Sequence, residues 1–150
     1  MMQKIMIATD GSDAGNRAAM AGIDIAHRSG GSIIAIYVMD LSRLSHLPGY
    51  ATLPGFKEKI LDLIEDEGRQ AIQFAQDRAQ AMSVSFHGIV AQGNPSAEIL
   101  KASLNHDADL IVIGSLGRTA IEKFLLGSVA EKVVFRSEIP VLLVKGDVVS

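Results

Sequence analysis

The chain contains no cysteine among its 150 residues. Disulfide bonds, thiolate nucleophiles and metal sites built on cysteine are therefore excluded. Nowhere do 18 apolar residues follow one another, so no segment is predicted to cross a membrane as a helix. The first residues also lack a long apolar region followed by a small-residue cleavage site, and we therefore expect a cytoplasmic protein.

The sequence has no basic stripe and no amphipathic helix rich in lysine and arginine. Its formal net charge is −3, and the two signs of charge are interspersed. This pattern argues against a nucleic-acid or membrane-surface partner. A free nucleotide remains possible, because backbone amides can hold phosphate locally. Aromatic residues are few, but an apolar fraction of 48% is that of an ordinary globular protein, and we expect a single domain over residues 1–150.

Several signatures of well-known enzyme classes are missing. There is no G-x-x-x-x-G-K-[ST] loop, no G-x-G-x-x-G after the first strand and no G-x-S-x-G elbow. No nucleophile is paired with an evident general base, so we predict no catalytic residues. The four histidines (His27, His46, His87 and His106) show no metal-ligand spacing, and we interpret them as surface or hydrogen-bonded residues without a metal site.

What the sequence does contain is an alternation of apolar strands with amphipathic helices. Strands that are apolar throughout are typical of a parallel sheet covered on both faces, which predicts an α/β fold. The expected strands are Lys4–Thr9, Ser32–Val38, Ser83–Gln92, Asp109–Ile113 and Val141–Lys145. The expected helices are Ala14–Arg28, Phe56–Met82 with Gly68 in its middle, Pro95–Asn105 capped by Asn94, and Thr119–Arg136 with a break at Gly127, while Met39–Pro54 is expected to be a loop.

A glycine-rich loop follows the fourth strand. Gly114 and Gly117 are separated by two residues, and Gly127-Ser128 comes after nine more. Backbone N–H groups between a strand and a helix hold phosphate, so this pattern points to a nucleotide. A plain turn is the alternative for the first two glycines alone. Ser128 followed by Glu131 also has the pattern of a capping box, a role that is compatible with ligand binding.

This glycine spacing resembles that of the ATP-binding branch of the universal stress protein family. Other matching segments are Ala8-Thr9-Asp10-Gly11-Ser12, Val38-Met39-Asp40 and Gly93-Asn94-Pro95, so the resemblance covers essentially the whole chain. It implies an open five-stranded parallel sheet in the order 3-2-1-4-5, with helices on both faces. It also implies ATP or another adenine nucleotide as the ligand, with Mg²⁺ carried by the nucleotide. Many nucleotide-binding members have proline where this chain has Ala8, which weakens one contact with the sugar.

The resemblance places the ligand in a crevice at the carboxyl ends of strands one and four. In the family, the aspartate after strand one and the backbone at the end of strand two border the adenosine, and the loop glycines with the following serine hold ribose and phosphates. The implied nucleotide-binding residues are Ala8, Thr9, Asp10, Val38, Ile113, Gly114, Gly117, Arg118, Gly127, Ser128 and Val129. Two of these residues have a simpler alternative role: Asp10 can be a turn former, and Arg118 can be solvated. Gly93, outside this set, can either approach the ligand or end strand three.

The resemblance therefore implies an ATP-binding regulatory module of the stress response, with an unknown protein partner. The alternatives are a slow ATP hydrolase, using water near the phosphates and Asp10, and a nucleotide-free scaffold dimer. The strand at 141–145 is apolar and would lie at an edge of the sheet, where the family's last strand commonly meets its twofold mate. We expect a homodimer through this strand, the alternative being a monomer whose tail, Gly146–Ser150, covers the edge.

Overall fold

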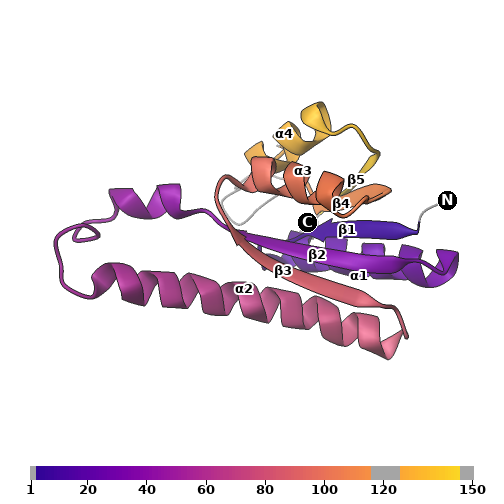
Figure 1. Ribbon diagram of the computed structural model, residues 1–150, viewed down its shortest axis with the longest axis horizontal. Helices are drawn as coiled ribbons and strands as arrows, with labels where there is room; N and C mark the ends of the chain where they lie inside the picture. The colour runs from indigo at the N-terminus through magenta and orange to yellow at the C-terminus, as the bar shows by residue number, and fades with distance from the viewer. Residues whose placement is uncertain (1–2, 116–125, 146–150) are drawn as a thin grey trace, which may run out of the picture.

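The computed structural model describes residues 3–115 and 126–145 (Figure 1). In this part of the chain, five strands form one parallel sheet in the order β3-β2-β1-β4-β5, which confirms the expected α/β fold and strand order. The strands are β1 (Lys4–Ala8), β2 (Ser32–Met39), β3 (Phe86–Gln92), β4 (Leu110–Gly114) and β5 (Val141–Val144). The helices are α1 (Asp13–Ser29), the 3₁₀ helix η1 (Leu41–His46), α2 (Phe56–Ala81), α3 (Pro95–Asn105) and α4 (Ser128–Arg136).

The sheet has a core on each face because successive side chains of a strand point to opposite sides. In β1, Ile5 and Ile7 join a core that α1 and α2 complete. Met6 and Ala8 of the same strand join a second core, completed by α3 and α4. Figure 1 shows these two helix pairs on opposite sides of the sheet. The resulting three layers leave the carboxyl ends of the strands as a shared edge.

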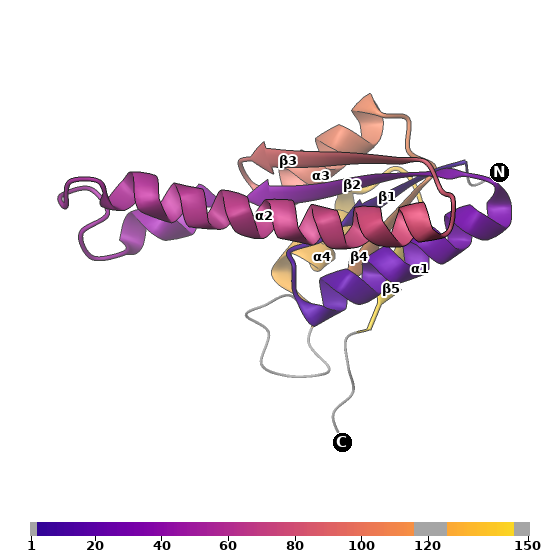
Figure 2. The ribbon, with the colours of Figure 1, turned by 90° about the horizontal axis from the view of Figure 1, so that it is seen from below.

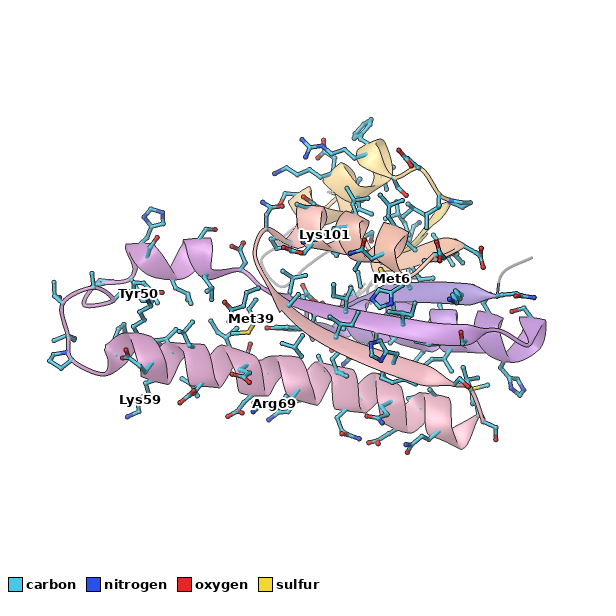
Figure 3. All side chains as sticks on the ribbon, in the orientation of Figure 1. Met6, Met39, Tyr50, Lys59, Arg69 and Lys101 are labelled. Atoms are coloured by element: carbon cyan, nitrogen blue, oxygen red, sulfur yellow. The ribbon has the colours of Figure 1, made fainter. Side chains whose placement is uncertain are left out.

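The helix α2 is longer than the sheet that it covers. Its buried residues begin only at Gly68, in the middle of the helix, and continue to Ala79. We call residues 56–67 of α2 the overhang; with η1 it extends beyond the sheet (Figures 1 and 2). Figure 3 shows Met39 between the end of β2 and α2, where it packs with Tyr37 and Ala71 in a small separate cluster.

Two predictions of local structure were wrong. The third strand begins at Phe86 instead of Ser83, because Ser83 has a φ of 56° and belongs to the turn that ends α2. The expected loop Met39–Pro54 contains the helix η1, whose start is capped by the Asp40 carboxylate accepting from the backbone N–H of Ser42. The expected helical segment before Gly127 lies mostly outside the described residues.

Among the helices that the structure describes, none is both long and apolar enough to cross a bilayer.

Candidate functional site

The carboxyl ends of β1 and β4 lie side by side, since Ala8 is in register with Ile113. The chain leaves β1 through a tight turn in which the Asp10 carboxylate accepts a hydrogen bond from the Ser12 N–H at 2.9 Å. Ser12 in turn caps α1, its hydroxyl accepting from the Gly15 N–H at 3.2 Å. Asp10 therefore does form the turn, and this position also places it at the edge of the sheet where the crevice was expected.

Gly114 ends β4 directly against the first turn of α1. A Cβ atom at this position would lie 2.9 Å from the carbonyl carbon, the carbonyl oxygen and the Cβ of Ala14. Backbone atoms cannot move aside to relieve such a contact, whereas the end of a flexible side chain can. The described residues therefore give Gly114 a packing role, which is independent of any ligand.

A backbone hydrogen bond brings the two ends of the glycine-rich loop together. The N–H of Gly127 donates to the carbonyl oxygen of Ser115 at 2.7 Å, and the N–H of Ser115 donates to the carbonyl oxygen of Val144 at 2.9 Å. We call this pair of bonds the Ser115 clasp. It fixes the start of α4 beside the end of β4 and ties both to the edge strand β5. Sequence reasoning missed Ser115, because a role of the backbone alone leaves no trace in the residue type.

The N-terminus of α4 has no side-chain cap in the described part of the chain. Gly127 is the N-cap residue, with φ −60° and ψ 150°, and Ser128 is already helical. The capping-box interpretation of Ser128 and Glu131 is therefore wrong, because an N-cap hydroxyl must come from the residue before the helix. Ser128 is exposed, and it lies with the first N–H groups of α4 at the positive end of the helix dipole.

The remaining predicted site residues fall into three groups. Ala8 and Ile113 are buried in the core beneath α3 and α4. Thr9 is buried too, and its hydroxyl accepts from the Gly11 N–H, so its side chain is already engaged. Val38 and Val129 are only partly buried and border the same core. Gly117 and Arg118 lie outside the described residues.

Gly93 follows β3 at the same edge of the sheet. Its φ of 143° disfavours any other residue, and an added Cβ would lie 2.8 Å from Oε1 of Glu98. The Gly93 N–H donates to the carbonyl oxygen of Met39 at 3.1 Å. These contacts account for the glycine as the residue that ends β3.

No metal centre is evident among the described residues, which contain no group of three or more histidine, aspartate or glutamate side chains placed to share an ion. A surface hollow is lined by residues between Tyr50 and Glu58, on the segment that leads into α2. None of the predicted nucleotide-binding residues lines it. The nucleotide crevice at the carboxyl ends of β1 and β4 therefore stays a prediction.

Comparison with known proteins gives a consistent result. Residues 1–145 match the model of the universal stress protein family. Universal stress protein MJ0531 of Methanocaldococcus jannaschii is 39% identical over 145 residues, which cover 97% of this chain and 83% of that protein. The solved structure of MJ0577, from the same organism, superimposes with a TM-score of 0.84 at 25% identity, covering 99% of both chains.

A second solved structure, described as a universal stress protein in complex with cAMP, has a TM-score of 0.68 and 27% identity. It covers 97% of this chain and 98% of its own. The family match over nearly the whole sequence, the identity to MJ0531 and the shared fold show that this chain belongs to the universal stress protein family.

Proposed function

We propose that this protein is a regulatory module of the stress response that binds an adenine nucleotide, ATP with Mg²⁺, at the crevice between β1 and β4. The observation that carries the proposal is the start of α4, which no described side chain caps and which the Ser115 clasp holds beside Gly114. An uncapped helix N-terminus at the carboxyl edge of a parallel sheet suits a phosphate group.

Hydrogen bonds already made at the start of α4 narrow the choice of donors for a phosphate. The N–H of Gly127 already donates to Ser115, so the donors that we assign to phosphate are the N–H groups of Ser128 and Val129 together with the Ser128 hydroxyl. Asp10 and the backbone near Val38 would border the adenosine on the other side of the crevice. Mg²⁺ would arrive with the nucleotide, since the residues that we assign to the phosphates are amides and a hydroxyl.

The relative whose solved structure is in complex with cAMP supports an adenine nucleotide as the ligand. The Ser115 clasp suggests how a nucleotide could act on an interface, because the same serine bonds both Gly127 and the edge strand β5. We propose that the protein forms a homodimer through β5 and that nucleotide binding at α4 shifts the equilibrium between monomer and dimer. We also propose that the protein works in the cytoplasm on a protein partner.

The decisive experiment is calorimetric titration of nucleotide-stripped protein with ATP and Mg²⁺, with AMP and cAMP titrated in parallel. We expect saturable binding of ATP to native protein and its loss in Gly127→Val, whose side chain would crowd the phosphate approach. A Leu63→Lys variant, altered on the exposed face of α2, is the matched control and should bind like the native protein. Absence of heat or saturation at millimolar ATP would exclude the proposed ligand. A separate assay for phosphate release would show whether the protein hydrolyses ATP.

A further inference from the structure

Two histidines that are distant in the sequence meet on the face of the sheet covered by α3. His87 belongs to the edge strand β3, in register with Ile34 of β2, and His106 is the C-cap residue of α3. Their ring centroids are 5.7 Å apart and the ring planes are tilted by 42°. The position of α3 over this face of the sheet brings the two side chains together.

Neither imidazole has a hydrogen-bond partner within the described residues. The two rings contact each other. His87 is exposed and His106 is partly exposed, so solvent reaches the pair. A neutral imidazole offers one nitrogen with a free lone pair. Two imidazoles that solvent reaches, with centroids 5.7 Å apart, can each supply one such nitrogen to a shared ion, and water can occupy the remaining coordination positions.

The separation suits a shared metal ion. With metal–nitrogen bonds of about 2.0–2.1 Å, a tetrahedral ion holds the centroids of two ligating imidazoles about 5.2 Å apart. The observed 5.7 Å exceeds this by an amount that small side-chain rotations can close. The tilt keeps the rings from stacking face to face, a geometry in which their nitrogens could not converge.

The electrostatic setting also favours a cation. His106 lies at the carboxyl end of α3, where the carbonyl groups of the last turn give the helix its negative pole. Asp107, the next residue in the chain, adds a formal negative charge. A divalent ion bound by His106 would therefore interact favourably with both.

We propose that His87 and His106 form a two-histidine site for a transition-metal ion of the Zn²⁺ and Cu²⁺ class. Imidazole ligands suit these ions, whereas Mg²⁺ and Ca²⁺ prefer oxygen. The bound ion links the edge strand β3 to the end of α3 and stabilises their packing. The site lies in the first half of β3, whereas the nucleotide crevice lies at the carboxyl ends of β1 and β4, so the metal is distinct from any Mg²⁺ carried by a nucleotide.

The test uses the full chain without an affinity tag, freed of metal and nucleotide and titrated with Zn²⁺ by calorimetry. We expect one ion per chain, with affinity at least about tenfold lower in His87→Gln and in His106→Gln, since each removes one of two ligands. His46→Gln is the matched control, because His46 is also exposed but lies on η1, and it should bind Zn²⁺ like the native protein. Equal affinity in native protein and in the double variant His87→Gln, His106→Gln would overturn the proposal.

A second measurement does not depend on the variants folding. Electron paramagnetic resonance of the native protein with one equivalent of Cu²⁺ should show hyperfine coupling to nitrogens of two imidazoles. Coupling to one imidazole or to none contradicts a shared site. Thermal unfolding should also shift to higher temperature with Zn²⁺ in the native protein, because a ligand that binds the folded state stabilises it.

Discussion

Ser128 lies at the start of α4 without capping it. A capping role and a ligand-binding role can therefore be told apart in one variant. Replacing a capping serine by alanine costs about 1 kcal/mol of stability. We expect Ser128→Ala to change the free energy of unfolding by less than about 0.5 kcal/mol, as at an ordinary surface position. If the hydroxyl binds phosphate, the same variant should bind nucleotide about tenfold more weakly, the loss of a charge-assisted hydrogen bond.

The control for this variant is Asn94→Ala. Asn94 does cap a helix, its side-chain oxygen accepting from the Ala97 N–H at 3.1 Å, so urea denaturation should show a loss of about 1 kcal/mol. A comparable loss in Ser128→Ala, with unchanged nucleotide affinity, would restore the capping role and contradict the assignment of this residue to the ligand.

Asp109 makes the stability of the fold depend on pH. One carboxylate oxygen accepts from the backbone N–H groups of Lys4 and Gln3, at 2.9 and 3.0 Å, and these two bonds hold the pKa of Asp109 below its ordinary value of 3.8. A carboxyl group whose pKa is lowered by folding stabilises the folded state above its unfolded pKa. That stabilisation is lost as the pH falls through the lower pKa of the folded state.

Asp109→Asn should therefore be less stable than the native protein near neutral pH, and the difference should shrink as the pH is lowered below about 4. Urea unfolding between about pH 2 and pH 7 measures it. Asparagine keeps an acceptor oxygen and removes the charge, so the comparison isolates the ionised form. A difference that stays constant over the whole range would show that the charge of Asp109 has no part in stability.

At the scale of the element, the middle of α2 has a glycine because the Tyr37 side chain of β2 leaves no room for a Cβ there. A Cβ on Gly68 would lie 2.7 Å from Cδ1 of Tyr37, a residue that is only 7% exposed. Alanine gains about 1 kcal/mol over glycine in helix propensity, whereas overpacking a core costs about 1–3 kcal/mol. We expect Gly68→Ala to lower stability by about 1 kcal/mol, against almost no change in Gln70→Ala at an exposed position of the same helix. Urea denaturation compares them; a stabilised Gly68→Ala would mean that the Tyr37 ring moves freely.

The edge strand β5 is the element on which the proposed dimer depends. Its outer edge has no neighbouring strand in the described sheet, and Leu142 and Leu143 are 39% and 37% exposed. An apolar edge strand tends to pair with another chain, so light scattering should give the mass of a dimer for native protein and of a monomer for Leu142→Lys. Leu63→Lys, at an exposed leucine of the overhang, should remain dimeric. A monomeric native protein at micromolar concentration would rule out this interface.

At the scale of the whole molecule, the sequence predicted where the strands lie along the chain better than which strands are neighbours in the sheet. Apolar runs located all five strands, because parallel strands buried on both faces leave such runs. Their order came from the family resemblance. Ile5 pairs with Leu110 across most of the chain, and no local pattern encodes such a contact.

The site was predictable to the same extent. Asp10 and Gly114 could be placed at one edge of the sheet, because each comes directly after an apolar run in the sequence. The Ser115 clasp and the pairing of His87 with His106 could not, since the first involves backbone atoms and the second requires the position of α3 over β3. The expected cap at Ser128 failed because sequence patterns place a helix start only to within a few residues.

The uneven burial of α2 has a consequence for how the molecule opens. The overhang contributes no buried residue, whereas the part of α2 from Gly68 onward packs on the sheet through Gly68, Ala71, Ala75 and Ala79. Amide hydrogens of the overhang can exchange with solvent through local fraying, but those of the packed part exchange only when the helix leaves the sheet. Hydrogen exchange followed by NMR should show low protection in residues 56–67 and protection rising steeply after Gly68. One continuous helix would thus open in two steps of different free energy.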